Sequence, residues 1–428
     1  MIDLRRAFRV LIGAAEPLAV ERVPAAEAAG RVAAADITAP ADVPGFLRVM
    51  MDGYACRAAD IATASAESPA ALRVSGEAAA GRPVAGGPAP GEAWRVTTGA
   101  ELPAGADVVV PLEQTRRQGD RVLVRQALPA GRNVAGAGED VRRGECIVRK
   151  GERIGPATAG VLVAAGLGSV PVIRRPRVLL LCTGSEVTDP DTGAAGAPPA
   201  PEPPAGRRVH NSNAAILAAD LRDLGIAFTY AGVLPDEPER LRVAFRSALA
   251  SEADVILTTG GVSVGPYDRV PRTWLDLGAR RLLGRIDVKP GGPFFAARHR
   301  DKWIIGLPGS PAACLATYQV LVRPFLLRLA GHRCIARPVV PAVLSRPFPK
   351  PADRDRLLWA RLEGAVPPYR AHLPTGDEGR LTWVARCNGL LWIPKGTPAL
   401  KAGSRLPGLR LDLPEDREEP DWEGTGPL

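Results

Sequence analysis

The segment Asp254-Val-Ile-Leu-Thr-Thr-Gly-Gly-Val-Ser-Val-Gly265 joins an apolar run to a glycine-rich turn. A second apolar run, Arg177-Val-Leu-Leu-Leu-Cys182, leads in the same way into Thr183-Gly-Ser-Glu186. Unbroken apolar runs of this length are typical of strands that are buried on both faces of a parallel sheet. Both segments therefore predict parallel strands that end in turns.

Predicted helices separate these strands. Over residues 213–224 and 237–250, apolar side chains recur every three or four positions, which is the spacing of an amphipathic helix. A further strand is predicted over 228–234. Alternation of helix and strand at this interval is typical of a doubly wound α/β domain, which we place at residues 177–331.

The regions on either side have a different character. Residues 1–45 and 146–176 predict an N-terminal helical and extended domain, with a first helix capped by Asp3 and a second at 156–165. Short alternating stretches predict a β-rich domain inserted at 46–145 and a C-terminal β domain at 335–412. The strand candidates are 71–74, 93–97, 107–112 and 121–125 in the first, and 358–362, 381–385, 389–393 and 406–411 in the second.

Two segments predict little regular structure. The stretch 189–208 is rich in Ala, Pro and Gly, which is typical of a flexible surface loop. The tail from Pro414 is acidic, and we expect it to be frayed.

Composition excludes several classes of protein. A chain of 428 residues is long enough for several domains, and its net charge of +9 suits an anionic partner. No block of Lys or Arg is longer than two residues and aromatic residues make up 5%, so the sequence does not predict nucleic-acid binding. A small phosphorylated ligand or a merely solvated basic surface accounts for the charge.

Cysteine and histidine usage argues against soft-metal chemistry. The six cysteines include no C-x-x-C pair and the four histidines form no paired motif, so any metal is expected to be hard and bound by oxygen. The N-terminus has no signal-peptide pattern and no apolar run has transmembrane length. We therefore expect a cytoplasmic protein without a membrane segment.

The glycine-rich turn is the first candidate ligand site. Ligands of open α/β sheets bind at the carboxyl ends of the strands, where backbone N–H groups of glycine turns hold phosphates. The segment matches neither the Walker A motif nor G-x-G-x-x-G. A tight strand-to-helix turn without a ligand is the alternative interpretation. The candidates are Gly260, Gly261, Ser263 and Gly265.

Carboxylates follow the ends of three predicted strands. Glu186, Asp236 and Asp268 would meet at one edge of a parallel sheet, together with Glu237. Crowded carboxylates repel unless a cation offsets their charge, and Mg²⁺ prefers oxygen ligands. The sequence predicts a magnesium site here, although for Glu237 a helix-capping role is the better interpretation.

Two Gly/Pro turns complete the predicted edge. Lys289 precedes Pro-Gly-Gly-Pro293 and can neutralise a phosphate, while Gly306-Leu-Pro-Gly-Ser-Pro311 precedes a predicted helix at 312–321. The candidates from the second turn are Pro308, Gly309, Ser310 and Pro311, and simple turn chemistry explains these two segments equally well. Asp52, Thr98 and Asp140 stand beside glycines in loops of the N-terminal half, where a simple turn is the better interpretation of each taken alone.

The order of these motifs resembles that of the molybdopterin molybdenumtransferases, a family related to one part of gephyrin. The resemblance covers residues 1 to about 412 and rests on an ordered set of motifs. They are Met51-Asp-Gly-Tyr-Ala55, Thr98-Gly-Ala with Pro103 and Gly105-Ala-Asp107, Gly138-Glu-Asp140, Thr183-Gly-Ser-Glu186, Asn211-Ser-Asn213, Gly260-Gly-Val-Ser-Val-Gly265, Lys289-Pro-Gly-Gly-Pro293 and Gly306-Leu-Pro-Gly-Ser-Pro311.

The resemblance implies a reaction and an assembly. Adenylyl-molybdopterin and molybdate would give molybdenum cofactor and AMP in an elongated homodimer, with contacts to the adenylyltransferase and to recipient molybdoenzymes. The resemblance places the active site between the α/β domain of one subunit and the N-terminal region of the other. That would bring Asp52, Thr98 and Asp140 to the acidic edge, where they would lie near molybdate or position the attacking oxygen.

The resemblance also assigns roles to the sheet edge. The 260–265 turn, Lys289 and the 308–311 turn would hold pterin and phosphate, and Glu186, Asp236 and Asp268 would hold Mg²⁺. The chain departs from the family pattern in having Arg48-Val-Met50 before Met51, Asn211 in place of a common Asp, and Gly292 in place of a common Lys. A molybdopterin adenylyltransferase and a non-catalytic cofactor-binding or scaffold paralogue are the alternatives.

Overall fold

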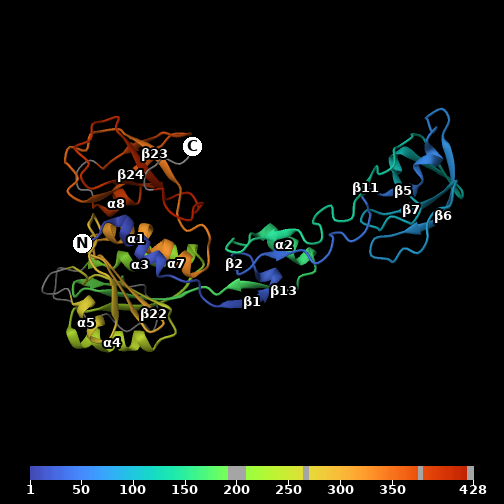
Figure 1. The fold of residues 1–428 in the computed structure, drawn as a ribbon. Coiled ribbons are helices and arrows are strands. Elements are labelled where there is room, and N and C mark those ends of the chain that lie inside the picture. Colours follow the sequence, from blue (N-terminus) through green and yellow to red (C-terminus); the bar gives the residue numbers. More distant parts are fainter. Residues whose placement is uncertain (191–208, 264–268, 375–378, 422–428) are drawn as a thin grey trace.

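The structure is a computed structural model that describes residues 1–190, 209–263, 269–374 and 379–421. The molecule is elongated (Figure 1). The α/β domain and the C-terminal β domain lie together at one end, the inserted β domain lies at the other end, and a small N-terminal body lies between them. The predicted fold class, a central α/β domain with N- and C-terminal flanking domains, is confirmed. The domain limits given above remain our proposal.

The central sheet has six strands in the order β17-β14-β18-β22-β21-β19. The first four are parallel, and β21 and β19 are antiparallel additions at one side. Their bounds are β14 (Arg177–Thr183), β17 (Ala227–Leu234), β18 (Val255–Thr259), β19 (Arg280–Leu283), β21 (Phe295–His299) and β22 (Lys302–Leu307). The strands predicted from the two opening segments are therefore neighbours in one parallel sheet.

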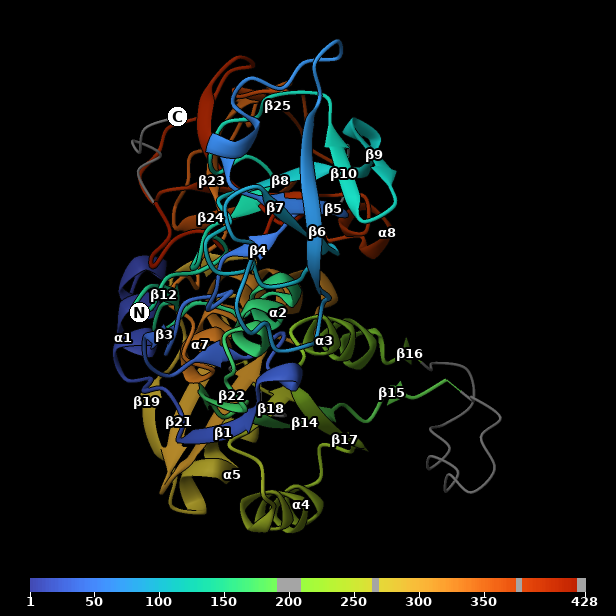
Figure 2. The same ribbon diagram turned by 90° about the vertical axis from the view of Figure 1, so that its right-hand side faces the viewer.

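Helices cover both faces of this sheet. In both ribbon views α4 and α5 lie on one face, whereas α1, α3 and α7 lie on the other (Figures 1 and 2). The bounds are α1 (Leu4–Gly13), α3 (Ser212–Asp223), α4 (Pro238–Ala250), α5 (Val270–Asp276), α6 (Pro311–Thr317) and α7 (Arg323–Leu329), with a π-helical turn at Tyr318–Val322 between the last two. This two-sided cover explains why the parallel strands are apolar throughout.

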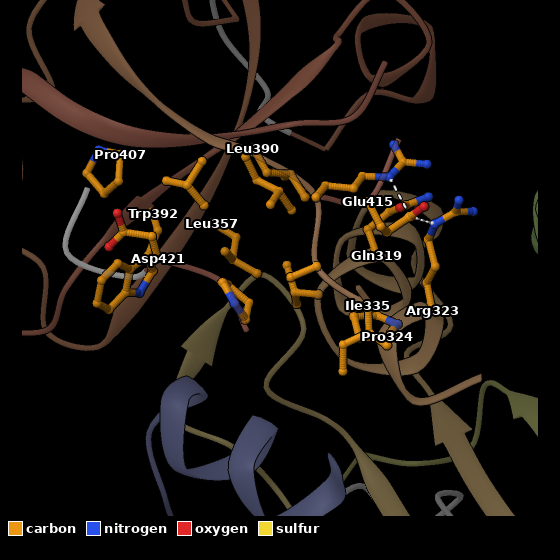
Figure 3. A pocket seen from close by; sticks show the side chains of 16 residues that line it. Gln319, Arg323, Pro324, Ile335, Leu357, Leu390, Trp392, Pro407, Glu415 and Asp421 are labelled. Atoms are coloured by element: carbon orange, nitrogen blue, oxygen red, sulfur yellow. Dashed lines mark hydrogen bonds and ion pairs between the residues drawn. The ribbon is translucent and has the colours of Figure 1, made fainter. Parts of the chain in front are cut away.

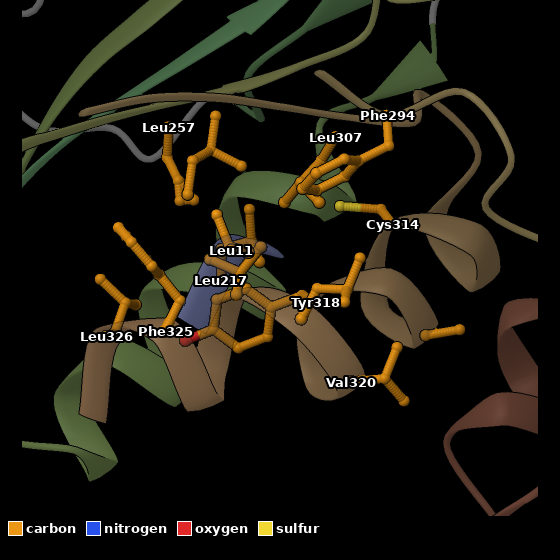
Figure 4. Packing of buried hydrophobic residues seen from close by; sticks show 14 of the residues in the cluster. Leu11, Leu217, Leu257, Phe294, Leu307, Cys314, Tyr318, Val320, Phe325 and Leu326 are labelled. Carbon is orange, nitrogen blue, oxygen red and sulfur yellow. The ribbon is translucent and has the colours of Figure 1, made fainter. Parts of the chain in front are cut away.

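The main core joins segments that are far apart in the sequence (Figure 4). Leu11 of α1 and Leu217 of α3 pack with Tyr318 and Phe325 from the helices after β22. Asp3 caps α1 as predicted, because its side chain accepts a hydrogen bond from the Arg6 N–H. The first helix therefore belongs in space to the α/β core, although it precedes the N-terminal body in sequence.

The N-terminal body and the inserted domain are built from short strands. The inserted sheet has the order β8-β5-β7-β6-β10-β9, and its predicted strands are confirmed. Its bounds are β5 (Gly53–Cys56), β6 (Ala70–Ala78), β7 (Glu92–Val96), β8 (Val108–Pro111), β9 (Thr115–Gln118) and β10 (Arg121–Val124). The N-terminal body contains α2 (Pro156–Ala164) and the strands β1 (Val20–Pro24), β2 (Val32–Ala33), β3 (Ile37–Thr38), β12 (Cys146–Val148) and β13 (Ser169–Ile173). A separate two-stranded sheet is formed by β4 (Arg48–Val49) and β11 (Val134–Ala135).

The C-terminal sheet has the order β20-β24-β25-β23-β27-β26, and β24 also pairs with β26. Its bounds are β20 (Val288–Lys289), β23 (Val339–Leu344), β24 (Asp355–Glu363), β25 (Tyr369–His372), β26 (Gly389–Ile393) and β27 (Arg405–Arg410). The strand predicted at 381–385 is wrong, because α8 (Leu381–Val384) occupies this segment. Trp383 and Val384 pack against the α/β core, so tertiary contacts override the β propensity of the sequence.

The acidic tail is also ordered, contrary to expectation, as far as Asp421. Glu415 accepts hydrogen bonds from Arg323 at 2.7 Å and Arg337 at 3.3 Å, and Arg417 pairs with Ala336 through the backbone. Both guanidinium groups and the carboxylate are largely buried. The tail is therefore fixed to the connection between the α/β and C-terminal domains.

The loop predicted at 189–208 lies outside the described residues from 191 onward. The segments on either side of it pair in parallel as β15 (Val187–Thr188) and β16 (Val209–His210). This pairing brings the two ends of the loop together beside the end of β14.

One helical stretch, Pro311–Leu329, is long and apolar enough to cross a membrane. However, 83% of its most apolar window is buried inside the protein. A core helix of the α/β domain accounts for its composition, because it packs against the apolar face of the central sheet.

Candidate active site

A cleft of about 520 Å³ opens at the carboxyl ends of the parallel strands. Its walls come from the turns after β14, β17, β18 and β22 and from the start of α3. This is the edge at which the sequence placed a ligand site. The lining includes Thr183, Gly184, Glu186, Asn211, Asn213, Asp236, Thr259, Gly260, Gly261, Ser263, Lys289, Pro308, Gly309 and Ser310.

The glycine turn forms the floor of this cleft, but Gly260 has a packing role that the sequence did not predict. Its φ is +87°, and a Cβ atom there would lie 2.4 Å from the Thr183 carbonyl oxygen. Its N–H donates to the Leu307 carbonyl at 3.0 Å and is therefore not available to a phosphate. Gly260 lets three strand ends meet, which leaves Gly261 and Ser263 as the ligand-facing candidates. Gly265 lies outside the described residues.

Two carboxylates, Glu186 and Asp236, line the same cleft. The Asp236 N–H donates to Ser185 Oγ at 3.2 Å, which ties the turn after β17 to the turn after β14. Glu237 does not line the cleft. It stands at the N-cap position of α4 as predicted, but its side chain pairs with Arg240 and makes no capping hydrogen bond. Asp268, the predicted third carboxylate, lies outside the described residues.

The described residues fit a magnesium ion in part. No group of three or more His, Cys, Asp or Glu side chains is placed to hold a metal within the described ranges. Mg²⁺ is, however, commonly bound by one or two carboxylates together with substrate phosphates and water. Glu186 and Asp236 meet that requirement for a ligand that carries its own phosphates.

The opposite wall combines a cation with a fixed turn. Lys289 ends β20, which pairs with β24 of the C-terminal sheet, so this lysine lies where two domains meet. The Asn213 amide donates to the Gly309 carbonyl at 2.8 Å and holds the 308–310 turn against α3. Pro311 begins α6 and is not part of the cleft lining.

An adjoining cleft of about 560 Å³ extends from Lys289 toward the C-terminal domain. It shares Lys289, Pro290, Ser310 and Ala313 with the first cleft and adds three cations from the C-terminal sheet and its loops. These are Arg346, Lys350 and Arg356. The combined space therefore has an acidic end and a basic end, which suits a ligand with several phosphates or oxyanions.

Sequence reasoning missed two groups of lining residues. Asn211 and Asn213 were recognised only as a motif, and the three cations of the C-terminal domain were not recognised at all. Asn211 caps α3 and donates to the Tyr230 hydroxyl oxygen at 2.8 Å, and Tyr230 donates to Asp189 at 2.7 Å. Burial, followed by the hydrogen bond to Asp189, raises the pKa of Tyr230, so it is a neutral donor.

Two of the three N-terminal candidates, Asp52 and Thr98, contact each other, and none of the three lines this cleft. Asp52 accepts hydrogen bonds from the Thr98 N–H at 2.7 Å and the Thr98 hydroxyl at 2.8 Å, which lower the pKa of Asp52. The Asp140 N–H donates to the Val43 carbonyl. Asp52 directly precedes β5 and Thr98 lies just after β7, and both strands are at the far end of the molecule (Figure 1). One chain alone does not assemble the full predicted set.

A separate cavity of about 30 Å³ lies under the acidic tail, between the α/β and C-terminal domains (Figure 3). Apolar side chains, among them Leu357, Leu390 and Trp392, form one side, and the Arg323–Glu415 pair lies at the other. The volume is enough for only one or two water molecules. It is a packing defect of the domain junction and not a second candidate active site.

Comparison with known proteins covers almost the whole chain. Residues 2–166 match the MoeA N-terminal region (domain I and II), residues 179–328 match a probable molybdopterin binding domain, and residues 341–407 match the MoeA C-terminal region (domain IV). Matches on both sides of the central domain disfavour the adenylyltransferase alternative.

Whole-chain relatives agree with these matches. Molybdopterin molybdenumtransferase 2 of Mycobacterium tuberculosis is 33% identical over 90% of this chain and 93% of its own length. Molybdopterin molybdenumtransferase of Bacillus subtilis is 32% identical over 92% and 90%. A crystal structure of the molybdopterin biosynthesis MoeA protein from Pyrococcus horikoshii superposes with a TM-score of 0.79 at 29% identity, covering 96% of this chain and 100% of that chain. The chain therefore belongs to the molybdopterin molybdenumtransferase family.

Proposed function

We propose that this protein inserts molybdenum from molybdate into adenylyl-molybdopterin and releases AMP. The observation that carries the proposal is the combined cleft, which has two carboxylates at one end and four cations at the other. Adenylyl-molybdopterin carries a diphosphate and molybdate is a dianion, so both substrates need cations. Family membership supports the same reaction.

Different residues of the cleft would bind different parts of the substrates. Lys289 and the three cations of the C-terminal domain would bind phosphate and molybdate oxygens, because guanidinium and ammonium groups form the strongest hydrogen bonds to oxyanions. Gly261, Ser263 and the 308–310 turn would hold the pterin and its phosphate. Asn213 positions that turn through the Gly309 carbonyl.

Glu186 and Asp236 would hold Mg²⁺, with Asp268 as the predicted third ligand. When bound, the ion would neutralise the diphosphate and so favour departure of AMP. Both carboxylates line the acidic end of the cleft, whereas Lys289 and the three C-terminal cations lie toward the other end. Two carboxylates at one end of a cleft favour a cation between them, which supports a metal at this position.

We also propose a cytoplasmic homodimer in which Asp52, Thr98 and Asp140 of one subunit reach the cleft of the other. None of the three lines the cleft of its own chain, and β5 and β7, next to which Asp52 and Thr98 lie, are at the opposite end of the molecule, which supports this arrangement (Figure 1). Contacts with the adenylyltransferase and with recipient molybdoenzymes would follow from the position of the reaction between them.

The test measures AMP release from adenylyl-molybdopterin with Mg²⁺ and molybdate. We expect Glu186→Ala to lower the rate by at least about a hundredfold, because it removes a metal ligand. Glu237→Ala is the matched control, since Glu237 pairs with Arg240 outside the cleft, and its rate should stay within about twofold of the unsubstituted protein.

Three outcomes would separate the alternatives. Equal AMP release from the protein and its Glu186→Ala variant would refute the enzyme proposal. Product formation from ATP and molybdopterin would identify an adenylyltransferase. Tight binding of adenylyl-molybdopterin without AMP release would identify a scaffold or storage paralogue.

A further inference from the structure

A cluster of arginines lies where the N-terminal body joins the α/β domain. Most of its members have a carboxylate partner: Arg31 pairs with Glu21, Arg174 with Asp254, and Arg333 with Glu152. Two do not. Within the described residues, Arg153 makes no hydrogen bond or ion pair, and Arg175 makes no ion pair. The cluster therefore carries two positive charges that no carboxylate of the described chain offsets in an ion pair.

Both unpaired guanidinium groups face the same glycine turn. A Cβ atom built on Gly30 would lie 3.1 Å from Arg175 Nη2 and 3.6 Å from Arg153 Nη2. Arg175 Nη2 donates to the Gly30 carbonyl at 3.0 Å, and a Cβ atom built on Gly225, just after α3, would lie 3.4 Å from the same guanidinium. A side chain at Gly30 would crowd both guanidinium groups, so the glycine allows the two cations to approach the same turn and each other.

The surroundings show the effect of this excess charge. Burial and then the neighbouring Arg31 and Arg153 lower the pKa of Arg175. Burial lowers the pKa of His332 to about 4, and although Glu415 opposes the shift, Arg153, Arg323 and Arg175 add to it. Arg31 Nε is buried and has no partner within the described chain. Unpaired charge in a partly buried place is unfavourable, and an anion relieves it.

We propose that Arg153 and Arg175 bind a tetrahedral dianion beside Gly30, of the class of phosphate, sulfate or molybdate. Two guanidinium groups match the charge of one dianion and can each donate two hydrogen bonds to its oxygens. Arg153 is exposed, whereas Arg31 and Arg175 are partly buried, so the dianion would reach the cluster from the side of Arg153. None of these residues lines the active-site cleft, so the site is distinct from it.

A dianion at the proposed site would link the N-terminal body to the α/β domain. Arg153 belongs to the N-terminal body, whereas Arg175 follows β13 and leads into β14 of the α/β domain. A dianion held by both would stabilise the angle between the two bodies. It would thus fix the direction in which the N-terminal body extends from the α/β domain.

The experiment is isothermal titration of the full chain with potassium phosphate, sulfate or molybdate at constant ionic strength, with chloride as the monovalent comparison. We expect saturable binding of a dianion that Arg153→Gln weakens by about tenfold or more, the effect of losing one charge-assisted hydrogen bond. Arg153 is exposed and unpaired, so this variant should fold. Arg116→Gln on the exposed strand β9 is the matched control, and its binding should not change.

Two further variants distinguish anion binding at the junction site from anion binding in the active-site cleft. Lys289→Gln should retain the junction site even if it loses anion binding in the cleft. Arg175→Lys should weaken binding, because lysine keeps the charge but lacks the planar fork. Unchanged binding in Arg153→Gln, an equal loss in Arg116→Gln, or loss only in Lys289→Gln would overturn the proposal.

A second copy of the chain is the competing occupant. If no dianion binds and Arg153→Gln shifts the sedimentation of the protein toward a monomer, a partner carboxylate occupies the position and the proposal is wrong. The result is independent of AMP release, so failure here leaves the proposed function untouched.

Discussion

At the scale of single residues, Gly260 lines the cleft and also allows the end of β18 to pack closely against the end of β14. Its neighbour in the sequence, Gly261, also has a positive φ of +61°, and a Cβ there would meet Val270 Cγ2 at 2.7 Å. Both glycines are therefore required by the protein itself before any ligand binds. The sequence pattern predicted glycines here because a ligand needs access to the backbone. The structure adds that no side chain would fit at these two positions.

Gly260→Ala should destabilise the protein more than Gly232→Ala. Both residues have nearly the same φ, +87° and +89°, but nothing lies within 4 Å of a Cβ at Gly232. The control should cost about 1–2 kcal/mol for the left-handed backbone alone, and the Gly260 variant at least about 2 kcal/mol more from the clash with Thr183. Chemical denaturation of both variants measures the difference, and equal losses would contradict this account.

His332 should make stability depend on pH. Its folded pKa of about 4 lies below the ordinary value of 6.5, so the native state favours the neutral imidazole. This contribution is fully present above about pH 6.5 and is lost as pH falls toward 4, by up to about 3 kcal/mol. His332→Gln should therefore reduce the difference in denaturation midpoint between pH 7.5 and pH 4.5.

The exposed His210 supplies the comparison for that experiment. His210→Gln should keep the pH dependence of the unsubstituted protein. If both variants lose stability to the same extent on acidification, then burial of His332 is not the cause.

At the scale of elements, the acidic tail and α8 show where sequence patterns mislead. Composition predicted a frayed tail, yet Glu415 lies between Arg323 and Arg337, and Asp220 accepts a second hydrogen bond from Arg323 at 2.7 Å. The pattern of α8 suited a strand, yet its Trp383 and Val384 face the α/β core. In both cases the decisive partners are far away in the sequence, so no local pattern contains them.

Glu415→Gln should lower the stability of the junction between the α/β and C-terminal domains. Removing the carboxylate leaves two buried guanidinium groups short of negative charge, at a cost of about 3 kcal/mol. Thermal unfolding and proteolysis near residue 414 would detect the loss. Glu418→Gln, at an exposed position of the same tail, should change neither, and equal sensitivity of both variants would show that the Glu415 pairs contribute little.

At the scale of the whole molecule, the separation of the N-terminal candidates from the cleft leads to a complementation test. If Asp52 acts in the cleft of the partner, Asp52→Ala and Glu186→Ala should each be inactive alone. Random exchange of subunits between the two variants would give hybrid dimers with one intact site. Activity should then recover to roughly a quarter of that of the unsubstituted protein.

Subunit exchange needs a control in which recovery is impossible. A mixture of Asp52→Ala and Asp140→Ala should not recover activity, because both substitutions affect residues contributed by the same subunit to the same site. No recovery with Asp52→Ala and Glu186→Ala, after exchange has been verified by a subunit label, would place all the residues in one chain.

Sequence patterns were sufficient to predict the parallel strands, the helices and turns between them, and the edge of the sheet at which the cleft opens. These features depend on periodicity and on residues that follow a strand directly, such as Glu186 and Gly261, so local chemistry is sufficient to predict them. The motifs also indicated the family that the comparisons then established. Residues whose role depends on neighbours close in the sequence could thus be predicted from the sequence.

Which groups from distant parts of the sequence lie together is visible in the tertiary structure alone. It brought Arg346, Lys350 and Arg356 to the cleft, docked Glu415 between two arginines and packed α1 into the α/β core. It also left β5 and β7, next to which Asp52 and Thr98 lie, at the far end of the molecule. It also placed Arg153 and Arg175 beside Gly30. Charges and packing surfaces interact through space, whereas periodicity is a property of neighbouring residues along the chain. For this reason the sequence predicts strands, helices and turns, and the structure is needed to show the contacts between distant residues.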